Sequence, residues 1–190
     1  MKDQTMNETL QTIARRRSVR RFKDEQIGEA ELRAILEAGL QAPSGHNDQS
    51  CFLLAVQDKA VLKAISEGSK AAMRMSPVDW VAGAGANEKF HIFYDAPTAV
   101  IVAARKDAVS PLADACAAIQ NMLLAAESLS LGSCWIGFVR YHFQDSDAYA
   151  KLGIPEGYEV QYGVALGCQP DGPAGKPPAR KPERCYRIIK

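Results

Sequence analysis

Apolar positions gather into four short runs that predict strands. Each run is rich in β-branched or aliphatic residues and lies between polar or glycine residues, which is typical of buried strands. Strands are expected at residues 52–56, 97–104, 133–139 and 160–168.

Between these runs, apolar residues recur at helical spacing. Leu32, Ile35, Leu36 and Leu40 lie on one face of a predicted helix, and Pro43 ends it because the residue before a proline avoids helical angles. The longest such stretch is apolar around much of its circumference, which predicts a central, enclosed helix. Helices are expected at residues 5–16, 29–41, from Asp58 onward, 111–131 and 145–152.

Two segments fit neither pattern. Residues 66–91 mix methionine, tryptophan, proline and glycine, which predicts short helices with a mobile loop, a candidate lid. Residues 169–190 form a proline-rich extended arm, and Cys185–Ile189 is a candidate edge strand within it. The whole chain, residues 1–190, is therefore expected to be one α+β domain. Its mixed central β-sheet is flanked by helices, and its C-terminal arm is long enough to reach a second subunit.

Composition excludes several classes of protein. The 190 residues carry a net charge of +1, which argues against a protein that coats nucleic acid. No apolar run approaches the roughly 20 residues that cross a bilayer, and no signal peptide is visible. The five cysteines are odd in number and lack a Cys-x-x-Cys pair, so we expect reduced thiols in a cytoplasm.

The small net charge hides two basic segments at opposite ends of the chain. Residues 15–23 hold six basic groups and no acid, and residues 176–190 hold six against one acid. These segments are either solvated termini paired with surface acids or two halves of one anion site. Arginine suits the second interpretation because its planar fork matches phosphate oxygens.

Common catalytic motifs are missing. There is no Gly-x-Ser-x-Gly or Walker sequence, and Gly83-Ala84-Gly85 does not complete a dinucleotide-binding pattern. The three histidines are far apart and show no metal-ligand spacing. Cys51 follows His46 by five residues, but a thiol at a strand is expected to be core.

Five motifs in a fixed order remain, and they span nearly the whole chain. They are Arg16-Arg17-Ser18-Val19-Arg20-Arg21-Phe22, Ala42-Pro43-Ser44-Gly45-His46-Asn47-Asp48-Gln49, Tyr94-Asp95-Ala96-Pro97, Gly132-Ser133-Cys134-Trp135-Ile136-Gly137 and Pro178-Ala179-Arg180-Lys181-Pro182. Together they resemble the nitroreductase family of FMN-dependent oxidoreductases. One departure is Ser50-Cys51, where the family often has Pro-Trp.

The resemblance implies a homodimer with FMN at the subunit interface and NADH or NADPH as electron donor. By position, Arg16, Ser18, Arg20 and Arg180 would hold the FMN phosphate and ribityl groups, and Arg17 would lie at the pyrimidine side of the flavin. Pro43, Ser44, Gly45 and Asn47 would come from the opposite subunit. Ile136 and Gly137 would lie along the ring, and Asn87 and Lys89 match family residues that touch it.

The function implied is ping-pong reduction of nitroaromatic, quinone or related electron-poor small molecules, with the chemistry on flavin N5 and no catalytic side chain or metal required. Two alternatives stay open. One is a flavin-holding or flavin-processing protein on the same scaffold without nicotinamide turnover. The other is a nucleic-acid binder that uses residues 15–23, which the chain's balanced charge and lack of a recognition motif argue against.

Overall fold

The computed structural model describes residues 6–170 and 187–189. Its centre is a four-stranded sheet in the order β1-β2-β4-β3, in which every neighbouring pair is antiparallel. The strands are β1 (Cys51–Val56), β2 (Thr98–Arg105), β3 (Gly132–Ile136) and β4 (Tyr158–Gly167).

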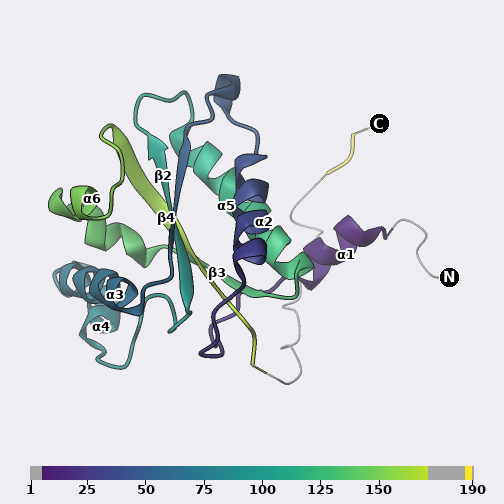
Figure 1. Cartoon of the computed structure of the whole chain (residues 1–190). Helices are drawn as coiled ribbons and strands as arrows, with labels where there is room; N and C mark the ends of the chain where they lie inside the picture. Colours follow the sequence, from purple (N-terminus) through teal and green to yellow (C-terminus); the bar gives the residue numbers. More distant parts are fainter. Residues whose placement is uncertain (1–5, 171–186, 190) are drawn as a thin grey trace.

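Helices cover both faces of this sheet (Figure 1). The α-helices are α1 (Glu8–Arg15), α2 (Glu29–Leu40), α3 (Lys59–Met73), α4 (Asp79–Ala86), α5 (Pro111–Ser128) and α6 (Asp147–Lys151). Two 3₁₀ segments, η1 (Gly45–Asn47) and η2 (Phe138–Gln144), connect them to the strands. No helix in the described ranges is both long and apolar enough to cross a membrane.

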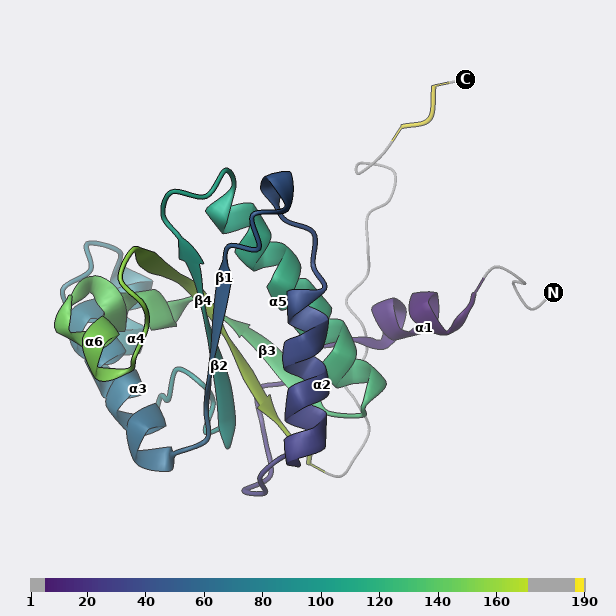
Figure 2. The ribbon, with the colours of Figure 1, turned by 45° about the horizontal axis from the view of Figure 1, so that its top comes forward.

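The two layers follow from the alternation of side chains along β2. Ile101 and Ala103 pack into the core under α3, whereas Val100 and Val102 pack into the core under α2 and α5. Since a strand that is apolar on both faces must be covered on both, the sheet lies between two helical layers. Figure 2 shows α2 and α5 on one side and α3, α4 and α6 on the other.

The element predictions are confirmed for all four strands and for the helices between them, with ends displaced by a few residues. The long helix ends at Ser128 instead of residue 131. The third strand ends at Ile136 because Gly137 takes helical angles and the chain enters η2.

Residues 66–91 are more helical than the sequence pattern predicts. Helix α3 continues to Met73, and its own residues Ser69 and Lys70 are buried, so polar residues on its buried face hide the apolar periodicity. Gly83 and Gly85 belong to α4, where a Cβ on Gly85 would come within 2.8 Å of the Lys70 carbonyl oxygen. Gly85 therefore allows α4 to pack closely against α3, so this glycine is a packing residue and not part of a loop. The role of this region as a lid stays a prediction.

The α+β class is confirmed, with one difference in the sheet. The described strands pair only antiparallel, and parallel pairing is confined to a single bridge between Ser18 and Ser133. Most of the C-terminal arm lies outside the described residues, and 187–189 form no strand. Arm exchange between subunits stays a prediction.

Candidate functional site

The N-terminal basic segment lies along β3. The Val19 N–H donates to the Ser133 carbonyl at 2.8 Å, next to the Ser18–Ser133 bridge. Burial raises the pKa of the Cys134 thiol, and the charges of Arg20 and Arg16 oppose that rise. Both guanidinium groups therefore act on the same stretch of β3.

Arg20 is supported by a strained turn that enters β2. Its guanidinium carbon lies 5.8 Å from the centre of the Tyr94 ring, and a hydrogen bond with Tyr94 raises the pKa of Arg20. Tyr94 and Asp95 both have φ near +57°, a left-handed conformation that costs free energy for residues other than glycine. Such strain persists where the surroundings enforce it, often at functional sites. The motif is visible in the sequence, but its contact with Arg20 is not.

Arg17 turns back onto the end of α1. Its Nη1 donates to the carbonyls of Ala14 and Arg16 at 2.8 and 2.7 Å, which suits a cation at a helix C-terminus. Its Nε–H is buried and has no hydrogen-bond partner among the described residues. One donor of this guanidinium is therefore unsatisfied within the described residues.

The turn at residues 43–49 is held in an unusual conformation. His46, Asn47 and Gln49 all have φ between +46° and +59°. The Ser44 hydroxyl accepts from the Gln49 N–H at 2.9 Å, so the turn bonds to itself. Pro43 and Asn47 are exposed at its surface.

Asp114 on α5 anchors this turn from below. Its carboxylate accepts from the Gly45 N–H at 3.0 Å, from the Ser50 hydroxyl at 2.7 Å and from the Ser110 hydroxyl at 2.8 Å. Burial alone would raise the pKa of Asp114, but these three bonds together lower it below its ordinary value. Ser50, where this chain departs from the family pattern, thus ties the turn to the core.

Sequence reasoning missed Asp114 because its two partners at the turn, Ser50 and Gly45, are 64 and 69 residues away. The available signal is a lone acid in the otherwise apolar start of α5, Pro111-Leu-Ala-Asp-Ala-Cys-Ala-Ala118. An acid on a buried helix face needs donors, and the hydroxyl and amide groups of the nearby turn provide them.

Gly137 and Ile136 end β3 in different ways. The Ile136 side chain is buried in the core, so this residue can offer only its backbone to a ligand. Gly137 is exposed, and no atom lies within 4 Å of the position that a Cβ would occupy. The end of β3 is therefore an open stretch of backbone that a flat ring can approach.

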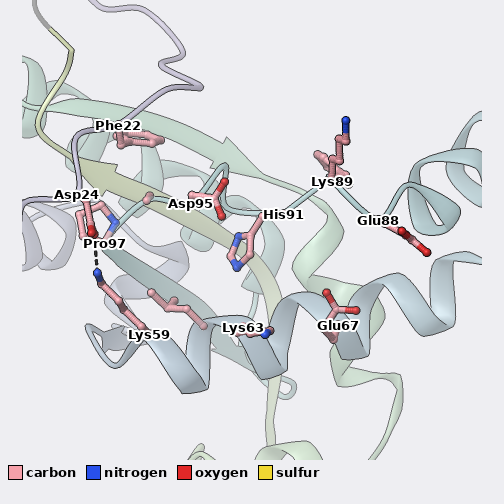
Figure 3. A pocket seen from close by; sticks show the side chains of 13 residues that line it. Phe22, Asp24, Lys59, Lys63, Glu67, Glu88, Lys89, His91, Asp95 and Pro97 are labelled. Carbon is pink, nitrogen blue, oxygen red and sulfur yellow. Dashed lines mark hydrogen bonds and ion pairs between the residues drawn. The ribbon is translucent and has the colours of Figure 1, made fainter.

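Asn87 and Lys89 lie beside a pocket of about 520 Å³ between α3 and the loop that follows α4 (Figure 3). The Asn87 side chain accepts from the Lys89 N–H at 3.0 Å. In Figure 3 the Lys89 side chain points away from α3, whereas His91 points toward it. Burial lowers the pKa of His91, so this imidazole is neutral at pH 7. Phe22 lines the same pocket, which brings Lys89 near the basic segment.

The structure does not bring all predicted site residues together in one chain. Ser18 pairs with Ser133 at the end of the sheet where β2 starts, whereas the 43–49 turn precedes Cys51 at the end where β2 stops. The length of β2, roughly 23 Å at about 3.3 Å per residue, separates these ends. Arg180 lies outside the described residues.

Other chemistries find little support in the described part of the chain. Burial raises the pKa of the free thiols of Cys51, Cys116, Cys134 and Cys168, which disfavours the reactive thiolate. The described residues also contain no cluster of His, Cys, Asp or Glu that would hold a metal ion.

Comparison with known proteins identifies the family. The nitroreductase family profile matches residues 13–168. The chain is 33% identical to the FMN reductase [NAD(P)H] of Bacillus subtilis, with 90% of this chain and 70% of the relative covered. It is 28% identical to the oxygen-insensitive NADPH nitroreductase of Salmonella typhimurium, with the same coverage.

A solved structure agrees with these relatives. The nitroreductase with bound FMN from Bacteroides fragilis superposes with a TM-score of 0.91 and 36% identity, covering 97% of this chain and all of that chain. The chain belongs to the nitroreductase family.

Proposed function

We propose that this chain is an FMN-dependent NAD(P)H oxidoreductase that reduces nitroaromatic, quinone or related electron-poor acceptors by ping-pong hydride transfer. Its relatives include an FMN reductase that uses NAD(P)H and an NADPH nitroreductase. The observation that carries the proposal is the basic segment bound to β3, with Arg16 and Arg20 acting on one stretch of that strand.

The described residues fit FMN on three counts. Arg16, Ser18 and Arg20 supply two cations and a hydroxyl suited to a phosphate. The buried Arg17 Nε–H needs an acceptor, which a flavin carbonyl or ring nitrogen provides. The open backbone at Gly137 leaves room for a flat ring system.

In this proposal the protein binds, orients and tunes the cofactor. Bound FMN would supply the redox chemistry, hydride transfer from the nicotinamide to the acceptor, while Arg16, Ser18 and Arg20 would hold its phosphate. The Arg17 charge on the pyrimidine side would favour the extra electron density of the reduced ring. No side chain is required as acid or base, because the cofactor carries the chemistry.

A homodimer is part of the proposal because one chain separates the two halves of the site. The Pro43, Ser44, Gly45 and Asn47 turn of one copy would complete the site that Arg16–Arg20 begins in the other. Helix α1 projects from the body on the α5 side (Figure 2). Leu10 and Ile13 on this helix and Met6 just before it are each more than 40% exposed, an apolar stripe suited to a subunit interface. The four cysteines within the described residues are free, which fits a cytoplasmic location.

The test is a visible spectrum of the purified, FMN-saturated protein before and after anaerobic NADH or NADPH. The proposal expects a yellow protein that bleaches with the donor and recovers its colour when nitrobenzene or benzoquinone is added. A yellow protein that neither donor reduces would favour the flavin-holding alternative. A protein that stays colourless after incubation with FMN would overturn the cofactor assignment.

A further inference from the structure

Trp80 on α4 is a large aromatic side chain that lies at the surface. Its indole is 68% exposed, although tryptophan is usually largely buried. It is not isolated, because its ring centre lies 5.9 Å from that of Phe138. Phe138 in turn meets Phe90 edge-on at 5.9 Å and Tyr141 at 6.4 Å. Trp80 is therefore the exposed end of a cluster of four rings.

This cluster adjoins the candidate cofactor site on two sides. Phe138 directly follows Gly137, the open end of β3. Phe90 contacts the Tyr94 ring at 5.9 Å, and Tyr94 carries Arg20 on its face. The rings thus extend from the arginine segment to α4 without a break in contact.

The backbone beside Trp80 is as open as the backbone at Gly137. Gly83 lies three residues further along α4 and so shares a helix face with Trp80. At both Gly83 and Gly137, no atom lies within 4 Å of the position of a missing Cβ. One exposed indole therefore stands beside stretches of bare backbone that leave space for a flat molecule.

From this arrangement we propose that Trp80 is a specificity-determining residue that positions a planar aromatic acceptor between α4 and Gly137. The inference rests on the proposed function, which places the reacting ring of the cofactor along Gly137. Aromatic rings recognise one another through offset or edge-to-face contacts, and the indole offers the largest such surface here. The Phe138 ring contacts the indole with an interplanar angle of 52°, and this contact restricts the orientation of the indole before the acceptor binds.

The test compares Trp80→Ala and Trp80→Phe with Met75→Ala in the FMN-loaded protein. Met75 is a matched control because it is 85% exposed and precedes α4. KM and kcat are measured for nitrobenzene and for ferricyanide, an inorganic acceptor that offers no ring to stack. Nitrobenzene binding to the oxidised protein without donor is followed through the flavin absorption spectrum.

We expect Trp80→Ala to raise both the KM and the Kd for nitrobenzene roughly 2- to 10-fold, the value of one aromatic pair. The ferricyanide kinetics and the FMN content should not change, and Trp80→Phe should restore most of the loss. The inference is overturned if Trp80→Ala behaves like Met75→Ala, or if both acceptors lose equally. If NAD(P)H does not reduce the wild-type flavin, the proposed function fails, while the Kd titration still decides the role of Trp80.

Discussion

A single carboxylate determines the shape of the turn that the proposed site needs. Asp114 is 3% exposed and bonds the turn through Gly45 and Ser50. Three residues of that turn have left-handed backbone angles, which an isolated peptide would rarely adopt. The anchor explains how so strained a turn persists.

Replacing Asp114 with alanine should lower the free energy of unfolding by about 1–3 kcal/mol, because the buried Ser50 hydroxyl loses its acceptor. Urea unfolding at pH 7 measures this loss. Since the folded pKa of Asp114 is lowered, its stabilisation is present above the unfolded value of 3.8 and is lost as the pH falls through the folded pKa. The difference between wild type and variant should therefore shrink in acid.

Asp79→Ala is the matched control, since Asp79 is an exposed acid in the first turn of α4. Equal losses in the two variants, or a difference that grows as the pH falls, would contradict the anchoring role.

At the scale of elements, two paired glycines let the basic segment lie flat on the sheet. Gly132 on β3 pairs with Gly167 on β4. A Cβ on Gly132 would meet Val19 at 3.0 Å, and one on Gly167 would meet Pro97 at 2.8 Å and Phe22 at 3.0 Å. Any larger residue at these positions would lift the segment that carries Arg16 and Arg20.

Gly167→Ala should accordingly destabilise the fold by about 1–3 kcal/mol through overpacking and weaken FMN binding. Thermal unfolding and a fluorescence titration with FMN measure the two effects. Gly163→Ala in the same strand is the control, because its nearest atom would lie at 3.4 Å. Unchanged FMN affinity in Gly167→Ala would mean that this segment does not hold the cofactor.

The elements were also the scale at which sequence patterns worked best. The run of aliphatic residues from Ala99 to Ala104 predicts β2 because both of its faces are buried. The apolar pattern does not predict burial at two positions. The basic residue Lys70 is only 2% exposed, and Gly85 allows α4 to pack closely against α3. Motif order located the arginines and the turn, but Asp114 and Tyr94 act through contacts that spacing along the chain does not encode.

At the scale of the whole molecule, α1 contributes little to the core of its own chain. None of its residues is buried, and the apolar side chains of Leu10 and Ile13 are each more than 40% exposed. A surface of this kind stabilises an assembly more readily than a monomer.

The double variant Leu10→Gln, Ile13→Gln should weaken subunit association by at least about 10-fold, since burying even one such side chain is worth about 1.5–3 kcal/mol. Size-exclusion chromatography with light scattering, run over a dilution series, measures the change. FMN content should fall with dilution in parallel. Met75→Gln serves as control, and a variant that stays dimeric at every concentration would move the interface elsewhere.

The separation of the arginine segment from the 43–49 turn has a genetic consequence. In the proposed dimer, a lesion at Arg16 and a lesion at Asn47 carried by different copies would fall into the same site of a mixed pair. The second site of that pair would be assembled wholly from intact parts. Two alleles that each encode an inactive protein when expressed alone would then complement one another when expressed in the same cell.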